Sequence, residues 1–172
     1  AYEPWKEVFY KHPAARIDMY SIGADILHAL IKAETDATKR DALVQELMGI
    51  YDRHIEYLDA VNAFRKRPLT KMSILEDKAH DYIIYTKPVD AGKAHTMILE
   101  VLNMDPANAG HQIMLDLMQV SSAIAKKKEA HKEQVIKDYL QTSELAANNF
   151  KTAKENVAKG GANAATYEKI AD

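Results

Sequence analysis

The chain has 172 residues and a formal net charge of −2, from 23 Lys and Arg against 25 Asp and Glu. This length suits one domain, and a charge so close to neutral argues against a nucleic-acid partner, which calls for a clearly basic surface. Because the sequence has no cysteine, it excludes disulfides, thiolate metal ligands and a cysteine nucleophile. Apolar residues make up 47% of the chain, so a packed core is expected rather than disorder.

Apolar side chains recur at steps of three and four along nearly the whole sequence, which is typical of amphipathic helices. Strict alternation, the signature of a strand, is not sustained anywhere. Glycine is scarce, with 6 residues, and none of the 5 prolines falls inside a periodic segment. The sequence predicts an all-α fold of stacked antiparallel hairpins, with helices near 2–11, 13–33, 36–60, 70–85, 89–103, 107–127, 129–147 and 149–159, the last with a tail to 171.

The first predicted helix opens with Pro4 and Trp5, and we expect the tryptophan ring to dock on the second helix as part of the core. Gly23 and Gly49 then fall in the middle of the second and third helices. Glycine there costs about 1 kcal/mol against alanine, so a close approach of a neighbouring helix is the expected compensation. The alternative is simple tolerance on a solvent-facing side.

Helix boundaries are marked by prolines and capping residues. His12-Pro13, Lys87-Pro88 and Asp105-Pro106 predict helix starts, because proline tolerates the first helical turn. Thr35-Asp36 is expected to cap the third helix, and Ser73 with Glu76 has capping-box spacing, with Thr70 as a rival cap. The lysines 126–128 are expected at a helix end, and 61–69 is the longest predicted interruption. No domain boundary is predicted.

Three segments resemble a family of tetratricopeptide-like proteins from Gram-negative gut anaerobes: AYEPWKEVF at 1–9, YSIGADIL at 20–27 and LMGIYDRHIEY at 47–57. The resemblance covers residues 1–60 well and the remainder mainly in helical layout, although Leu58-Asp59-Ala60 stands where the family usually has glycine. Ser73 to Pro106 also has the 34-residue length of one such repeat, with Ala94 at the helix crossing. The resemblance implies a short α-solenoid located in the periplasm or at the outer membrane, without established catalytic residues; a cytoplasmic location remains an alternative.

No catalytic signature stands out. The seven histidines are scattered without a pair at helical spacing, and Glu76 with His80 is one pair where zinc needs three or four ligands. No cofactor and no metal are therefore expected. The alternative is an enzyme or small-ligand carrier, metal-dependent or not, whose pocket would gather several of His28, His54, His80 and Glu76.

The sequence favours a non-enzymatic binding or scaffolding module that recognises a peptide or protein partner through a concave helical surface. No apolar run reaches the ~18–20 residues of a membrane span. A third alternative is a structural piece of a larger assembly, and the chain is expected to be one helical-repeat domain, alone or as the N-terminal portion of a longer protein. The candidate ligand-binding residues are Tyr57, Tyr82, Tyr85, Tyr139, Arg65 and Arg67.

Overall fold

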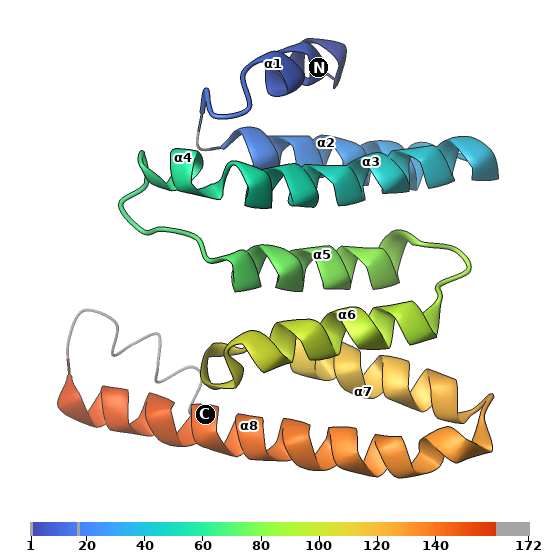
Figure 1. Cartoon of the computed structure of the whole chain (residues 1–172), viewed down its shortest axis with the longest axis vertical. Helices are drawn as coiled ribbons and strands as arrows, with labels where there is room; N and C mark the ends of the chain where they lie inside the picture. The colour runs from blue at the N-terminus through green and yellow to red at the C-terminus, as the bar shows by residue number, and fades with distance from the viewer. Residues whose placement is uncertain (1, 17, 161–172) are drawn as a thin grey trace. The chain divides into compact units, whose positions relative to one another are not determined.

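A computed structural model describes residues 2–16 and 18–160, and every regular element in these ranges is helical (Figure 1). The predicted all-α class is confirmed for this part of the chain, which holds eight α-helices, two short 3-10 helices and no strand. None of these helices is long and apolar enough to cross a membrane. The chain divides into two compact units, Ala1–Asp90 (unit 1) and Ala91–Asp172 (unit 2).

Unit 1 is built on an antiparallel hairpin of its second and third helices, against which its first and fifth helices pack. Its helices are α1 (Tyr2–Lys11), α2 (Met19–Ala33), α3 (Ala37–Glu56), α4 (Leu58–Asn62) and α5 (Lys71–Tyr85). α3 contacts both α2 and α5, so the core lies on its two flanks. The side chains most fully buried there are Phe9, Tyr20, Leu27, Val44, Leu47, Ile50 and Val61.

The second helix begins later than predicted, at Met19 rather than at residue 13. Residues 13–15 form a turn, in which the Ala15 N–H donates to the His12 carbonyl at 3.0 Å. The Asp18 carboxylate, at the N-cap position, pairs with the Arg16 guanidinium at 3.0 Å and makes no side-chain cap. The predicted third helix is interrupted at Tyr57, where α3 ends and the short α4 begins.

Helix α1 is held on α2 by a tryptophan seated against a glycine. A Cβ atom at Gly23 would lie 2.1 Å from Cζ2 of Trp5, so only glycine leaves room for the ring. The indole N–H donates to the Met19 carbonyl at 3.0 Å, and the ring is buried. The expected docking and the close approach at Gly23 are confirmed. At Gly49 the expectation is wrong, because that residue is exposed with nothing within 4 Å.

Two predicted caps form as hydrogen bonds. The Asp36 carboxylate accepts from the Lys39 N–H at 2.9 Å at the start of α3. At the start of α5 the rival cap is the correct one, since Thr70 Oγ1 accepts from the Ser73 N–H at 3.0 Å and Ser73 Oγ accepts from the Thr70 N–H. This reciprocal pair fixes where α5 begins and therefore which of its residues face α3.

Unit 2 is a three-helix arrangement in which the middle helix, α7, contacts both of the others. Its elements are α6 (Ala91–Met104), the 3-10 helix η1 (Pro106–Asn108), α7 (His111–Ala125), the 3-10 helix η2 (Glu129–His131) and α8 (Lys132–Lys159). The core side chains buried most fully are Ile98, Val101, Leu102, Ile113 and Leu117.

Three boundaries of unit 2 differ from the sequence prediction. α6 starts at Ala91, after Pro88, and Asp105-Pro106 begins only the three-residue η1, after which α7 starts at His111. No break occurs near residue 148, so the last two predicted helices are the single 28-residue α8. α8 ends at Lys159 and is followed by the capping residue Gly160, whose φ of 66° only glycine adopts readily. The predicted tail to 171 lies outside the described residues. The lysines 126–128 follow the end of α7, as predicted.

Candidate functional site

A carboxylate oxygen joins the three long helices of unit 1. His28 on α2 and Asp81 on α5 form a close pair, with 2.6 Å between Nε2 and Oδ2. The Tyr51 hydroxyl on α3 donates to the same Oδ2 at 2.5 Å. Burial, followed by the hydrogen bond to Asp81, raises the pKa of Tyr51, so the phenol stays a proton donor. Tyr85, one turn beyond Asp81, stacks on His28 with 4.8 Å between ring centroids.

This network opens onto a pocket of about 380 Å³ whose walls come from α2, α3, α5 and the loop before α5. Its lining is polar for a protein interior, with carboxylates, imidazoles and a guanidinium gathered around two tyrosine rings. The ionisable lining residues are Asp25, His28, His54, Arg65, Asp77, His80 and Asp81, and the tyrosines are Tyr20 and Tyr51.

His54 is a neutral member of the pocket wall. Its ring lies flat on Tyr20, with 4.1 Å between centroids and 6° between planes. Desolvation by burial, followed by the positive charge of Arg65, lowers the pKa of His54 to about 4, so the imidazole is uncharged at neutral pH. Its Nε2 is buried and makes no hydrogen bond within the described part of the chain. Burial likewise raises the pKa of Tyr20 to about 12.

Among the carboxylate and guanidinium groups that line the pocket, negative charges outnumber positive ones. Three carboxylates, Asp25, Asp77 and Asp81, stand against a single guanidinium. Asp77 is exposed at the rim, yet desolvation by the surrounding protein and repulsion from Asp81 and Glu76 raise the pKa of its carboxyl group. The pocket is therefore suited to a group that brings positive charge or a hydrogen-bond donor.

Two of the candidate residues chosen from the sequence belong to this region of unit 1. Arg65 lines the pocket, and Tyr85 is half-buried against His28. The signal that would have strengthened the pocket prediction is the row of polar residues at helical spacing on α5, Asp77 and Asp81, beside His80. The sequence alone does not reveal this role, because the partners of these residues lie on other helices.

The other four candidate residues lie apart from the pocket. Tyr57 is half-buried beneath the Arg53 guanidinium, 5.1 Å from its ring centroid. Tyr82 is 6% exposed and packs in the core of unit 1. Arg67 is exposed in the loop before α5, and Tyr139 is exposed on α8 of unit 2.

Unit 2 holds a second network built on a carboxylate. His95 on α6 lies 2.8 Å from Asp138 on α8, measured between Nε2 and Oδ2. Ser121 on α7 donates to the same Oδ2 at 2.5 Å, and Gln134 donates to Oδ1 at 2.8 Å. His131, on η2, adds an imidazole nitrogen 3.3 Å from Ser121 Oγ.

The carboxylate of this second network is fully buried, and it is held in the charged form. Desolvation acts to raise the pKa of Asp138, but hydrogen bonds from Ser121, Gln134 and His95 outweigh it, so the net pKa is lowered. Neither Ser121 nor Asp138 is singled out in the sequence analysis. The sequence signal for this network is a polar residue on the apolar face of each of three helices.

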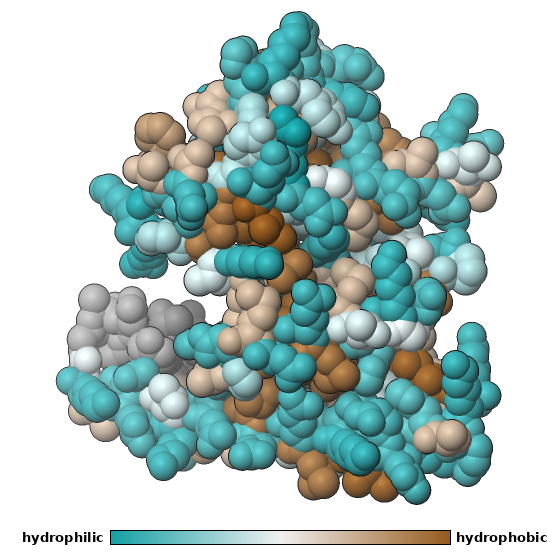
Figure 2. Space-filling view, in the orientation of Figure 1, coloured by the Kyte–Doolittle hydropathy of each residue, from teal (hydrophilic) through white to brown (hydrophobic). Residues whose placement is uncertain are grey.

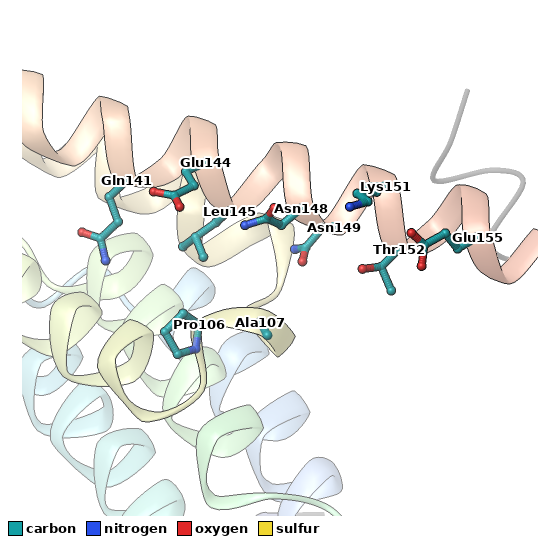
Figure 3. Close-up of a pocket in the computed structure, with 10 residues that line it drawn as sticks. All are labelled: Pro106, Ala107, Gln141, Glu144, Leu145, Asn148, Asn149, Lys151, Thr152 and Glu155. Atoms are coloured by element: carbon teal, nitrogen blue, oxygen red, sulfur yellow. The ribbon is translucent and has the colours of Figure 1, made fainter.

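A shallow groove of about 560 Å³ runs along α8 beside η1, and Figure 3 shows the side chains that line it. Pro106 and Ala107 of η1 form one wall, and Leu145 of α8 lies between polar neighbours in the other. Most of the polar members are uncharged, the charged ones are two glutamates and one lysine, and Asn149 already donates to the Ala109 carbonyl at 3.2 Å. The groove therefore offers polar contacts without a concentrated charge. The polar lining residues are Gln141, Glu144, Asn148, Asn149, Lys151, Thr152 and Glu155.

Helix α8 also carries apolar side chains on the face opposite its buried one. Ile136, Tyr139, Leu140 and Phe150 are between 41% and 61% exposed, whereas the buried face carries Leu145. The spacing of the exposed set places it along one stripe of the helix. Figure 2 shows brown apolar surface along the lower edge of the molecule, where α8 runs in Figure 1.

Comparison of the chain with models of protein families, with curated proteins and with solved structures found no match.

Proposed function

We propose that the protein is a non-enzymatic binding module and that the pocket of unit 1 is its recognition site for a basic group on a peptide or protein partner. The observation that carries the proposal is the excess of carboxylates in that pocket, Asp25, Asp77 and Asp81 against Arg65. An amino group entering there relieves the repulsion between Asp77 and Asp81.

The walls of the pocket suit a lysine side chain in particular. Tyr20 and Ile50 supply apolar surface for a methylene stem, while the carboxylates accept hydrogen bonds from an ammonium group. The neutral His54 adds no opposing charge at physiological pH. A partly buried ion pair of this kind contributes more than an exposed one, because water screens it less.

The test is titration calorimetry with paired peptides that carry either a free lysine or an acetyl-lysine at the same position. The free-lysine peptide is expected to bind at least about tenfold more tightly, since acetylation removes the charge. Asp77→Asn should remove most of that difference, while Asp41→Asn, an exposed carboxylate of α3 outside the pocket, should leave it unchanged. Equal binding of the two peptides, or equal effects of the two variants, would overturn the proposal.

We extend this proposal to the arrangement and location that the resemblance implies, a short tetratricopeptide-like solenoid at the cell envelope. The antiparallel α2–α3 hairpin and the short connections between helices support the first part. Fractionation of the native host with an antibody against the protein tests the second. Recovery in the cytoplasmic fraction alone would contradict an envelope location.

A second candidate function is the binding of a small cationic molecule in the same pocket. It is favoured by the convergence of His28, His54 and His80 on one cavity, the arrangement expected of a small-ligand carrier. A thermal-shift screen against free diamines and amino-acid amides tests it. A shift with these compounds, together with no discrimination between the paired peptides, would favour the carrier over the peptide-binding module.

A further inference from the structure

The buried network of unit 2 has the composition of a metal site. Ligand atoms of His95, His131 and Asp138 all lie within 4.8 Å of one another. The residues come from α6, η2 and α8, so an ion bound among them would tie three separate elements of the unit together. Two imidazoles with one carboxylate are a ligand set that first-row divalent metals use in proteins, and three protein ligands leave a position open.

We propose that His95, His131 and Asp138 bind a divalent transition metal ion, for which zinc is the probe. In a tetrahedral zinc site with bonds of about 2.0–2.2 Å, neighbouring ligand atoms are roughly 3.3–3.6 Å apart. To bind zinc, the 2.8 Å distance between His95 Nε2 and Asp138 Oδ2 has to lengthen slightly. The largest distance between two ligand atoms, which is at most 4.8 Å, has to shorten. His131 lies in a three-residue 3-10 helix and is half-buried, so its ring is the ligand with room to adjust.

The surrounding hydrogen bonds already orient the carboxylate for this role. Gln134 donates to Oδ1 of Asp138, which leaves Oδ2 directed at His95 and Ser121. An oxygen that binds a metal through one lone pair still accepts a hydrogen bond through the other, so Ser121 can remain in place. Such outer partners hold ligand geometry and tune affinity in known metal sites.

Access and charge are compatible with an ion entering from solvent. His95 and Asp138 are buried, at 9% and 0% exposure, so the entry side is the half-buried His131. Lys126, Lys127 and Lys128 precede η2 but are exposed, where solvent and salt screen their repulsion of a cation. The site lies within unit 2 and does not depend on the pocket proposed for recognition in unit 1.

The test is equilibrium dialysis of the untagged full chain against zinc, followed by elemental analysis, with Co²⁺ absorption as a readout of coordination. One zinc per chain is expected, together with the visible d–d bands of a tetrahedral Co²⁺ complex. Zinc should also raise the melting temperature, with a stabilisation that grows as the logarithm of its concentration above the dissociation constant, and a chelator should reverse the rise.

The variants separate this site from adventitious binding by surface histidines. His131→Ala and the near-isosteric Asp138→Asn are expected to weaken zinc at least about 100-fold and to abolish the Co²⁺ bands. His111→Ala, which removes an exposed imidazole from the same unit, should bind as the parent does. Substoichiometric zinc in the parent, or equal losses in His131→Ala and His111→Ala, would overturn the proposal. Should Asp138→Asn fail to fold, the half-buried His131 still decides it.

Discussion

The two units use the same device, a carboxylate that accepts hydrogen bonds from an imidazole on one helix and a hydroxyl on another. In unit 1 the acceptor is Asp81, bonded by His28 and Tyr51. In unit 2 it is Asp138, bonded by His95 and Ser121. In each unit the histidine, the hydroxyl and the carboxylate follow one another in chain order on three successive long helices.

The surroundings of the two carboxylates differ. Asp138 is fully buried, and both of its oxygens accept hydrogen bonds, so it links the helices of a closed core. Asp81 lines an open pocket beside Asp77, so part of its charge faces a cavity rather than a partner. The comparison teaches that the same hydrogen-bonded carboxylate can either hold helices together or expose negative charge to a ligand. Which of the two it does depends on whether other side chains bury it.

The largest expected effect comes from removing each carboxylate. Asp138→Ala leaves the buried donors His95 and Ser121, and the half-buried Gln134, without an acceptor and should cost unit 2 about 3 kcal/mol. Asp81→Ala should cost unit 1 only about 2 kcal/mol, because water in the pocket can reach the donors left behind. Hydrogen-exchange mass spectrometry under native conditions measures the two units separately. Equal losses would break the distinction between a closed and an open network.

The next largest effect is expected from acid, which should lower the stability of the two units at different pH values. The pKa of His54 is lowered to about 4 from an unfolded value near 6.5, so in this window the unfolded state binds more protons and unit 1 loses stability as pH falls. The pKa of Asp138 is lowered as well, so its contribution persists until pH falls below the unfolded value of about 3.9. Unit 1 should therefore destabilise at higher pH than unit 2.

His54→Phe keeps the stacking on Tyr20 and removes the titrating group, so it should flatten the pH dependence of unit 1 between about 6.5 and 4. The raised pKa of Asp77 acts in the opposite sense. The comparison is therefore made in an Asp77→Asn background, by urea denaturation at several pH values. A slope unchanged by His54→Phe would show that another group causes it.

Smaller losses are expected from deleting the hydroxyls. Ser121→Ala and Tyr51→Phe each remove one hydrogen bond to a carboxylate, at a cost of about 1.5–2 kcal/mol in unit 2 and about 1 kcal/mol in unit 1. Chemical denaturation of the two variants against the parent measures both. A larger loss of stability in Tyr51→Phe than in Ser121→Ala would contradict the prediction that water in the pocket reduces the cost in unit 1.

The smallest expected effects are gains in stability, one in each unit and larger in unit 1. Gly49→Ala should stabilise α3 by about 1 kcal/mol, because the position is exposed and a Cβ atom meets nothing within 4 Å. Ser143→Ala on the exposed face of α8 is the matched change for unit 2 and should give a gain of a few tenths of a kcal/mol. A loss in Gly49→Ala would mean that the solvent-facing side of α3 is in contact with something in solution.

The helices could be predicted because their signals are local. The three-four spacing of apolar residues, Asp36 before α3 and Thr70 before α5 each act within a turn or two of the chain. The predicted starts of α2 and α6 were too early, because Pro13 and Pro88 lie before these helices and not in their first turns.

The candidate site could be predicted only in part, because its members meet only in the folded chain. The sequence offers His28, His54 and His80 as members of one pocket under the alternative function, but it carries no local signal that Asp81 joins them. His28 and Asp81 are 53 residues apart, and His95 and Asp138 are 43 apart. A histidine or aspartate on a helix has the same local signal whether it faces solvent or a partner. The predicted tyrosines illustrate this, since Tyr82 is in the core while Tyr139 is exposed.

The seating of Trp5 against Gly23 gives the molecule an optical label of its own. Trp5 is the only tryptophan of the chain, so indole emission comes from the contact of α1 with α2 and from nowhere else. Any side chain larger than hydrogen at position 23 forces the ring outward. A red-shifted spectrum with unchanged helical circular dichroism would then mark the release of α1 alone, which makes that first helix separately visible in any solution experiment.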